Sequence, residues 1–212
     1  MATIAYALTT KEKVKEFLGI TGTTNDALID SLINYITDFI ESYVGGRRFK
    51  ETPYTNEEYD LPNGNIVFIR QFPLTELTSA QYLTGSIASP VWVSFTANDF
   101  QTYLKEGYVK FFSSFASILA ESERALRFTY KAGYKIDFAN ELSATHTLPF
   151  DIAMVATQLV SRMFNLRTAE GIKSESTEGQ SITYDRDTDV SQQLTIEQKA
   201  TLEKYKKHKL TI

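Results

Sequence analysis

Two long segments with apolar residues at helical spacing lie on either side of a central stretch that lacks this spacing, and their order constrains the fold most. In the first segment, apolar residues recur every three or four positions: Leu28, Ile29, Leu32, Ile33, Ile36, Phe39, Ile40 and Tyr43. The second segment repeats the pattern: Ile152, Val155, Ala156, Leu159, Val160 and Met163. Such stripes are typical of amphipathic helices. We expect helices near 25–45 and 149–170 that bury their stripes against each other.

The first of these stripes is wider than a single partner helix needs. It either packs between two neighbours within the fold, the commoner arrangement, or also faces another subunit. Two shorter helices are predicted near 9–19 and 195–209. Thr9 with Glu12 predicts an N-terminal capping box for the first, and Gly19 predicts its end. Thr195 with Gln198 predicts a second capping box for the last helix.

From Arg47 the character of the chain changes, and residues 48–134 are divided into short segments rich in Val, Ile, Phe, Tyr and Thr. Asn63-Gly64 predicts a hairpin turn, and Pro73 interrupts the strand pattern. The predicted strands are 66–69, 80–83, 91–95, 103–104, 108–112 and 125–130. Their even spacing without helices predicts an antiparallel sheet or small barrel. We therefore predict an α+β fold, in which residues 1–46 and 148–212 form a helical core and residues 47–147 form a β-rich inserted domain.

Composition limits the chemistry of this chain. The 212 residues include no cysteine and two histidines, which excludes disulfides, thiolate nucleophiles and sulfur-ligated metals. The net charge of −4 differs from the basic excess typical of proteins that grip DNA phosphates. Apolar runs such as 152–160 are too short to span a bilayer. The N-terminus lacks the pattern of a secretory signal, so we expect a protein made in the cytoplasm and no membrane partner.

The patterns that could carry chemistry are weak. His146 lies in a Ser/Thr-rich loop and His208 among lysines, and we interpret both as solvated side chains. The acidic residues between 57 and 60 lack the ligand spacing of a calcium loop, so we predict a solvated loop there. Residues 45–48, Gly-Gly-Arg-Arg, follow a helix instead of opening one, which predicts a helix end with surface arginines and no phosphate cradle. We predict no catalytic residue, no cofactor and no metal site.

The C-terminal part of the chain is polar from residue 173 to 189, with one β-like stretch at 181–184. We predict an extended arm that gains order on another chain. The last helix ends in a lysine-rich run at 204–209, the one basic patch of the sequence. This patch contacts DNA or an acidic partner, or it complements the negative end of its own helix, and the sequence does not choose between these interpretations.

Taken in order, several segments resemble the head–tail connector (adaptor, head-completion) family of tailed bacteriophages. Thr9 to Ile20 and Asp26 to Ile33 resemble its two N-terminal helices, and Gly46-Arg47-Arg48-Phe49 resembles the glycine and Arg-Phe-like pair that follow them. Arg127 to Tyr134 resembles the strand of longer members that ends in Ala-Gly-Tyr. Leu148 to Ala156 resembles the start of their third helix. The likeness covers most of the chain. The β insertion is a departure, because compact members lack it.

This resemblance implies a structural virion protein with no enzymatic activity, located in the neck of the particle. It implies a homo-oligomeric ring, usually of twelve subunits, that docks on the portal protein and offers its other face to a stopper or tail protein. DNA passes through the centre without sequence-specific binding. The arm and terminal helix are the parts expected to engage the portal or an adjacent subunit. The candidate interface residues are Ile182, Tyr184, Leu202, Lys204, Tyr205, Lys206, Lys207 and Lys209.

Three alternatives remain open from sequence. A head-closure or tail-completion protein would more often be mainly β than bracketed by helices. A small acidic enzyme needs two carboxylates that converge in a pocket, which sequence neither shows nor excludes. A sequence-independent DNA-binding module would have an affinity that falls steeply with salt, because phosphate contacts release counterions.

Overall fold

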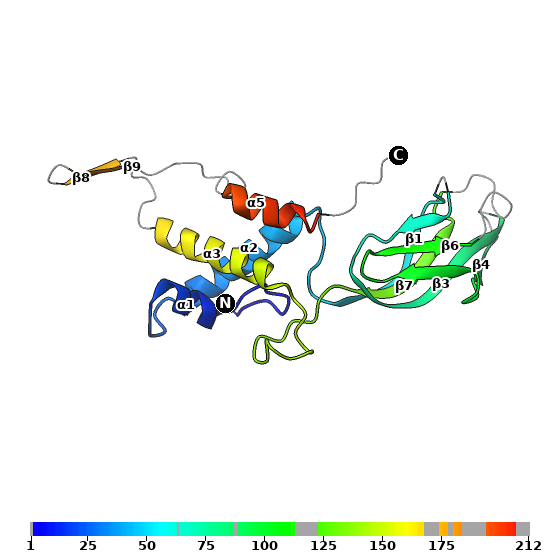
Figure 1. Ribbon diagram of the computed structural model, residues 1–212, viewed down its shortest axis with the longest axis horizontal. Helices are drawn as coiled ribbons and strands as arrows, with labels where there is room; N and C mark the ends of the chain where they lie inside the picture. The colour runs from blue at the N-terminus through cyan, green and yellow to red at the C-terminus, as the bar shows by residue number, and fades with distance from the viewer. Residues whose placement is uncertain are drawn as a thin grey trace. The chain divides into compact units, whose positions relative to one another are not determined.

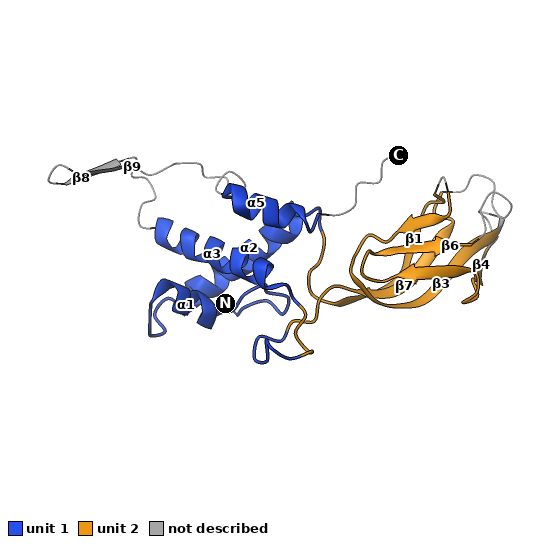
Figure 2. Ribbon diagram, in the orientation of Figure 1, with its two compact units in different colours: residues 1–46, 137–143, 148–206 blue, residues 47–136, 144–147, 207–212 orange. Residues whose placement is uncertain are grey.

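The computed structural model describes residues 2–62, 64–86, 89–112, 123–167, 174–177, 180–183 and 194–206. Within these ranges the chain forms four helices and antiparallel strands, which confirms the predicted α+β class. It divides into two compact units (Figure 2). The helical unit comprises residues 1–46, 137–143 and 148–206, and the β unit residues 47–136, 144–147 and 207–212. That the inserted segment is an independent domain stays a prediction.

The helical unit contains α1 (Lys11–Leu18), α2 (Asp26–Tyr43), α3 (Phe150–Leu166) and α5 (Ile196–Glu203) (Figure 1). Helices α1, α2 and α3 pack on one another, and α5 packs on α3. The two long stripes bury each other as predicted. Side chains that are fully or almost fully buried include Ile29, Ile33, Ile36 and Ile40 of α2, and Ile152, Leu159 and Val160 of α3. Within the described residues, every helix is too short or too polar to span a bilayer.

The ends of the helices differ in detail from the sequence predictions. The N-cap of α1 is Thr10, whose hydroxyl accepts a hydrogen bond from the Lys13 backbone N–H, so the box assigned to Thr9 was wrong. The Thr9 hydroxyl is buried 2.7 Å from that of Thr157 on α3, a tertiary contact that the local pattern does not reveal. Gly19 ends α1 in the left-handed conformation, as predicted. The Thr195 capping box is confirmed.

Three further boundaries were wrong or remain open. Pro149 stands before the first turn of α3 as its N-cap and not inside that turn. Helix α5 ends at Glu203 and not at residue 209, and residues 204–206 form a turn. The final residues, 207–212, lie outside the described part of the chain.

The β unit contains two sheets. The larger has the order β1-β7-β3-β4, with β1 (Thr52–Tyr59), β7 (Leu126–Ala132), β3 (Leu74–Ser86) and β4 (Ser89–Ser94). The smaller has the order β2-β6-β5, with β2 (Ile66–Phe68), β6 (Tyr108–Phe111) and β5 (Phe100–Tyr103). All these strand pairs are antiparallel. Side chains of both sheets fill one aromatic-rich core: Tyr59, Val67, Ile69, Leu74, Ala80, Val109, Phe111, Leu126, Phe128, Tyr130 and Ala132.

Strand β1 was not predicted, and the hairpin expected around residues 61–65 does not form between its neighbours. Strands β1 and β2 flank that segment but belong to different sheets. Residues Glu57 and Glu58 therefore lie on a strand and not in the predicted loop. The sequence of β1 is polar, and its pairing with β7, a strand some 70 residues later in the chain, makes it a strand.

Candidate partner interface

Helix α5, part of the predicted interface, is fixed to the helical unit by polar contacts. Gln198 Nε2 donates a hydrogen bond of 2.9 Å to Gln158 Oε1 of α3. Beyond the end of α5, the Tyr205 hydroxyl donates to the Asp151 carboxylate at 2.8 Å. Leu202 is completely buried. This predicted interface residue therefore packs α5 onto the helical unit and is not accessible to a partner. The segment from 195 to 206 is thus anchored at both of its ends.

In the basic turn after α5, one lysine is exposed and another contacts side chains of the same unit. Lys204 is exposed. Lys206 forms an ion pair with Glu203, and its ammonium lies 4.7 Å from the centre of the Tyr43 ring. The hydrogen bond to Glu203 raises the pKa of Lys206 above its ordinary value. These contacts support the interpretation that part of the lysine-rich run at 204–209 interacts with the end of its own helix. Lys207 and Lys209 lie outside the described residues.

The predicted β-like stretch of the arm is a hairpin in the described backbone. Strand β8 (Ser174–Thr177) pairs with β9 (Gln180–Thr183), and Ile182 lies opposite Glu175. Two strands alone are marginally stable in water. Among the described strands, β8 and β9 pair only with each other, so each has one edge that no other described strand covers. Strand addition to a partner uses such an edge. Tyr184 lies outside the described residues.

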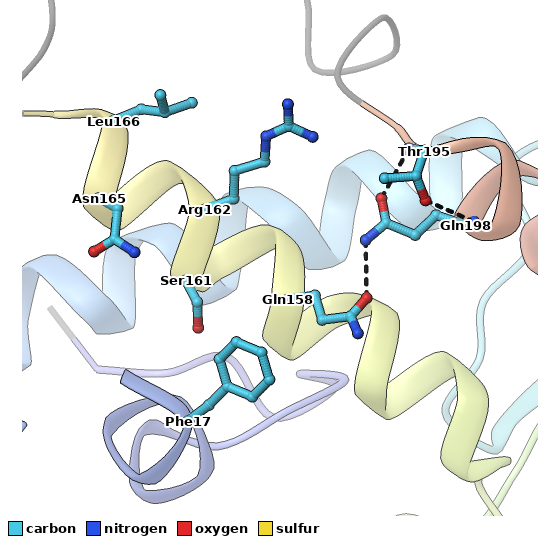
Figure 3. Close-up of a pocket in the computed structure, with 8 residues that line it drawn as sticks. All are labelled: Phe17, Gln158, Ser161, Arg162, Asn165, Leu166, Thr195 and Gln198. Carbon is cyan, nitrogen blue, oxygen red and sulfur yellow. Dashed lines mark hydrogen bonds between the residues drawn. The ribbon is translucent and has the colours of Figure 1, made fainter. Parts of the chain in front are cut away.

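A groove of about 480 Å³ runs along α3 between α1 and α5 (Figure 3). Its wall includes Phe17 of α1, whose side chain is 54% exposed, and Ser161 of α3, which is 2% exposed. The Ser161 hydroxyl has no hydrogen-bond partner within the described residues. The remaining lining residues are Gln158, Arg162, Asn165, Leu166, Thr195 and Gln198. No carboxylate is among these residues, so the groove does not offer the two converging acids that the enzyme alternative with Asp/Glu chemistry requires.

The sequence interpretation did not single out this groove, because it followed only the buried stripe of α3. The outward face of the helix carries a signal of its own. Phe150 and Met154 interrupt that face with apolar side chains that are 60% and 50% exposed. Apolar residues one helical turn apart on a face expected to be polar indicate an exposed apolar patch of α3, although neither residue lines the groove itself.

Arg47 is the clearest correction to the predicted sites. It was expected on the surface, but it is 1% exposed within the β unit. Its guanidinium carbon lies 3.8 Å from the centre of the Phe72 ring, and Nε donates a hydrogen bond of 2.8 Å to the Phe72 carbonyl oxygen. The rings of Phe49 and Tyr134 lie 5.3 and 5.6 Å away. Planar stacking and fixed donors let arginine occupy such an aromatic site.

This cluster unites two segments of the family resemblance. The Arg-Phe pair at 47 and 49 contacts the Ala-Gly-Tyr segment at 132–134. The Tyr134 backbone N–H donates a hydrogen bond of 2.6 Å to the Phe49 carbonyl oxygen. Gly133 has a φ of +116°, and a Cβ there would lie 2.7 Å from backbone atoms of Lys50 and Glu51. Only glycine fits this approach.

The acidic group at 57–60 and His146 also occupy structural positions. The Glu57 carboxylate accepts hydrogen bonds from the hydroxyls of Tyr59 and Tyr130. Burial raises the pKa of both tyrosines well above its ordinary value, which keeps them protonated as donors. Asp60 accepts a hydrogen bond of 2.8 Å from the Arg124 backbone N–H. His146 is 8% exposed, which corrects the predicted solvated histidine.

Comparison with protein families gives a match over almost the whole chain. The sequence profile of a family described as head completion protein matches residues 7–207. The chain belongs to the head completion protein family. The predicted resemblance to the bacteriophage head–tail connector proteins is thereby confirmed, and this head completion protein is a structural protein of phage assembly. No curated protein matches the chain.

Solved structures share the fold of this head completion protein. One is a chain from the neck of an empty GTA particle computed with C6 symmetry, with 13% identity and a TM-score of 0.55, and the match covers 94% of this chain and 89% of that one. Another is from the neck of a native GTA particle computed with C12 symmetry, with 12% identity and a TM-score of 0.53 over 94% and 88%. The fold that they share includes both units of this chain.

Proposed function

We propose that this head completion protein forms a homo-oligomeric ring in the virion neck, between the capsid portal and a stopper or tail protein, with DNA passing through its channel. The observation that carries the proposal is the family match over residues 7–207. The likeness to neck chains of particles treated with sixfold and twelvefold symmetry supports a cyclic arrangement of identical chains around the DNA.

The charge of the protein suits DNA that slides through a channel. The net charge of −4 disfavours tight binding of phosphates. Helix α2 contributes to this balance, since its sequence contains four acidic residues and no lysine or arginine. The ring would therefore surround DNA without retaining it.

The proposed contact with the portal or an adjacent subunit uses the arm and the end of the chain. Helix α5 is held rigidly by Leu202 and the Tyr205–Asp151 hydrogen bond, so it can present Lys204 and Lys206 in a fixed position. The β8–β9 hairpin with Ile182 offers a strand edge. Tyr184, Lys207 and Lys209 complete the proposed interface.

Mass measurement tests this function. The purified chain is measured by native mass spectrometry alone and after mixing with rings of candidate portal proteins. We expect a closed oligomer, alone or on the portal template. A chain that remains monomeric under both conditions contradicts the proposal. DNA affinity is measured in parallel at several salt concentrations, and a tight affinity that falls steeply with salt would instead identify a DNA-binding module.

A further inference from the structure

The groove along the last two turns of α3 contains a buried polar group that lacks a partner. Ser161 lines the groove, yet it is 2% exposed and its hydroxyl has no hydrogen-bond partner within the described residues. Its side chain points toward Phe17 on the other side of the groove (Figure 3). Buried polar groups in folded proteins nearly always have a partner, so the groove fits an occupant that supplies a hydrogen-bonding group.

The course of the chain between α3 and α5 brings it back to this groove. Helix α3 ends at Leu166, but α5 begins beside the middle of α3, because Gln198 donates its hydrogen bond to Gln158. Gln158 lies about two turns before Leu166, which is ~12 Å at 1.5 Å per residue. After leaving the end of α3, the chain therefore has to return along about 12 Å of that helix to reach α5.

The groove follows the same two turns of α3. Leu166 lines it at the end of α3, and Thr195, the N-cap of α5, lines it where α5 begins (Figure 3). Leu194, which is 4% exposed, fixes the chain where it enters α5. Other sides of α3 pack on α1 and α2, so the groove is the open path beside the helix.

The residues directly before Leu194 suit this path in length and in chemistry. They are Val-Ser-Gln-Gln at 190–193, and they lie outside the described residues. An extended chain of four residues covers about 13 Å. Val190, the one apolar residue between Tyr184 and Leu194, would then lie at the level of Leu166. The hydroxyl, the amides and the backbone of 191–193 supply donors and acceptors for Ser161.

Charge supports the same register. Asp189 comes directly before Val190 and would lie beyond the last turn of α3. Arg167 stands there with an exposed side chain. The lining residues of the groove include one charged side chain, Arg162, and no acid. An acidic residue at this end of the segment therefore meets opposite charge.

We infer that residues 190–193 of this chain lie extended in the α1–α3–α5 groove, along the last two turns of α3. Residues 168–189, which include the arm, then leave the helical unit and return to it at one place, the C-terminal end of α3. Both strands of the β8–β9 hairpin are thereby attached to a single fixed point. The inference goes beyond the proposed ring, because it concerns a contact within one chain.

The absence of cysteine allows a direct test by disulfide formation. Asn165, exposed in the groove, and Val190 are replaced together as Asn165→Cys and Val190→Cys in the full chain. The matched control joins Asn165→Cys to Asp185→Cys, which closes a loop of similar length but lies beyond the groove in the inferred register. We expect the first pair to oxidise within one chain about 10-fold faster, because the contact raises the effective concentration of the thiols. Loss of free thiols and non-reducing electrophoresis measure it.

Hydrogen exchange of the wild-type chain, followed by NMR, provides a test without cysteine variants. The backbone amides of 190–193 should exchange more slowly than those of 185–189. Ser161→Ala removes the hydroxyl that the segment is inferred to bind, and it should speed the exchange of 190–193. Uniform exchange from 185 to 193 contradicts the inference.

The outcomes separate this inference from the proposed ring. Equal oxidation rates for the two cysteine pairs overturn the inference and leave the ring unaffected. Covalent dimers from the Asn165/Val190 variant show that the groove takes the segment of another copy, which also overturns it. A wild-type chain that stays monomeric alone and with portal rings removes the ring, whereas fast intrachain oxidation of that same chain still supports the inference.

Discussion

The two units of this protein bury their apolar side chains to different degrees. In the β unit, the side chains of two sheets enclose a single core, and even a cation, Arg47, is 1% exposed among aromatic rings. In the helical unit, the core between α1, α2 and α3 is also fully buried, yet four large apolar side chains are at least half exposed: Phe17, Tyr35, Phe150 and Met154. Aromatic side chains fill the core of the β unit, although Phe112 of that unit is 61% exposed. The helical unit leaves Phe17, Tyr35 and Phe150 at least half exposed.

This difference indicates that the two units have different roles, one in folding and the other in contact with other chains. A chain that leaves several large apolar side chains exposed on one small unit presents surfaces suited to contact. The β unit gains its stability from internal stacking and hydrogen bonds, so substitutions there should change folding more than assembly. Substitutions of the exposed apolar side chains of the helical unit should do the reverse.

The largest effect expected is on the stability of the β unit. Arg47→Ala removes the guanidinium from its aromatic site and leaves the Phe72 carbonyl without that donor. We expect a loss of about 3 kcal/mol in the free energy of unfolding, from the void and the lost hydrogen bonds. Urea denaturation followed by tyrosine fluorescence measures it. The control Arg124→Ala, whose side chain is 78% exposed, should change stability by less than about 0.5 kcal/mol. Equal effects would contradict the assignment.

The next effect concerns the helical unit, where we expect a substitution to change assembly more than stability. Tyr35→Ala truncates an aromatic side chain of α2 that is 51% exposed. We expect little change in the stability of the single chain but an affinity between copies about 30-fold weaker, or about 2 kcal/mol, as for an aromatic interface residue. Sedimentation velocity over a concentration series measures it. Val91→Ala, which truncates a 52% exposed residue of the β unit, should leave assembly unchanged.

A smaller effect is expected at the start of α5. Thr195→Ala removes the hydroxyl that accepts the Gln198 backbone N–H, and we expect a loss of about 1 kcal/mol. Thr195→Ser keeps the oxygen and should retain most of the stability. Thermal unfolding of both variants tests the cap, and equal melting temperatures for Ala and Ser would contradict it.

The smallest effect concerns pH. The hydrogen bond from Lys15 lowers the pKa of Asp26 below its ordinary 3.8, with Lys11 adding to the shift. A lowered folded-state pKa contributes stability that is present above pH 3.8 and is lost as pH falls through the folded value. Asp26→Asn should therefore be slightly less stable than wild type near neutral pH, and the difference should vanish in acid. A difference independent of pH would exclude this cause.

The sequence predicted the element types well where the signal is local. The stripes of α2 and α3 and the strands β2, β4, β6 and β7 follow from spacing of three to four or two residues. The capping box at Thr195 and the helix end at Gly19 were also predicted, because such caps depend on residues within one turn. Among the candidate interface residues, the sequence correctly located a final helix and a β-like arm, but their binding role stays a prediction.

The remaining features depend on residues far apart in the chain. Strand β1 exists because a polar segment pairs with β7, and Arg47 is buried because Phe72 and Tyr134 meet it. The groove requires α1, α3 and α5 to come together. The sequence by itself determined the helices and most of the strands, since local periodicity and turn residues record them, and the order of its segments resembles the family that the profile match shows. Tertiary structure alone decided which side chains are enclosed, because burial depends on neighbours that sequence distance does not specify.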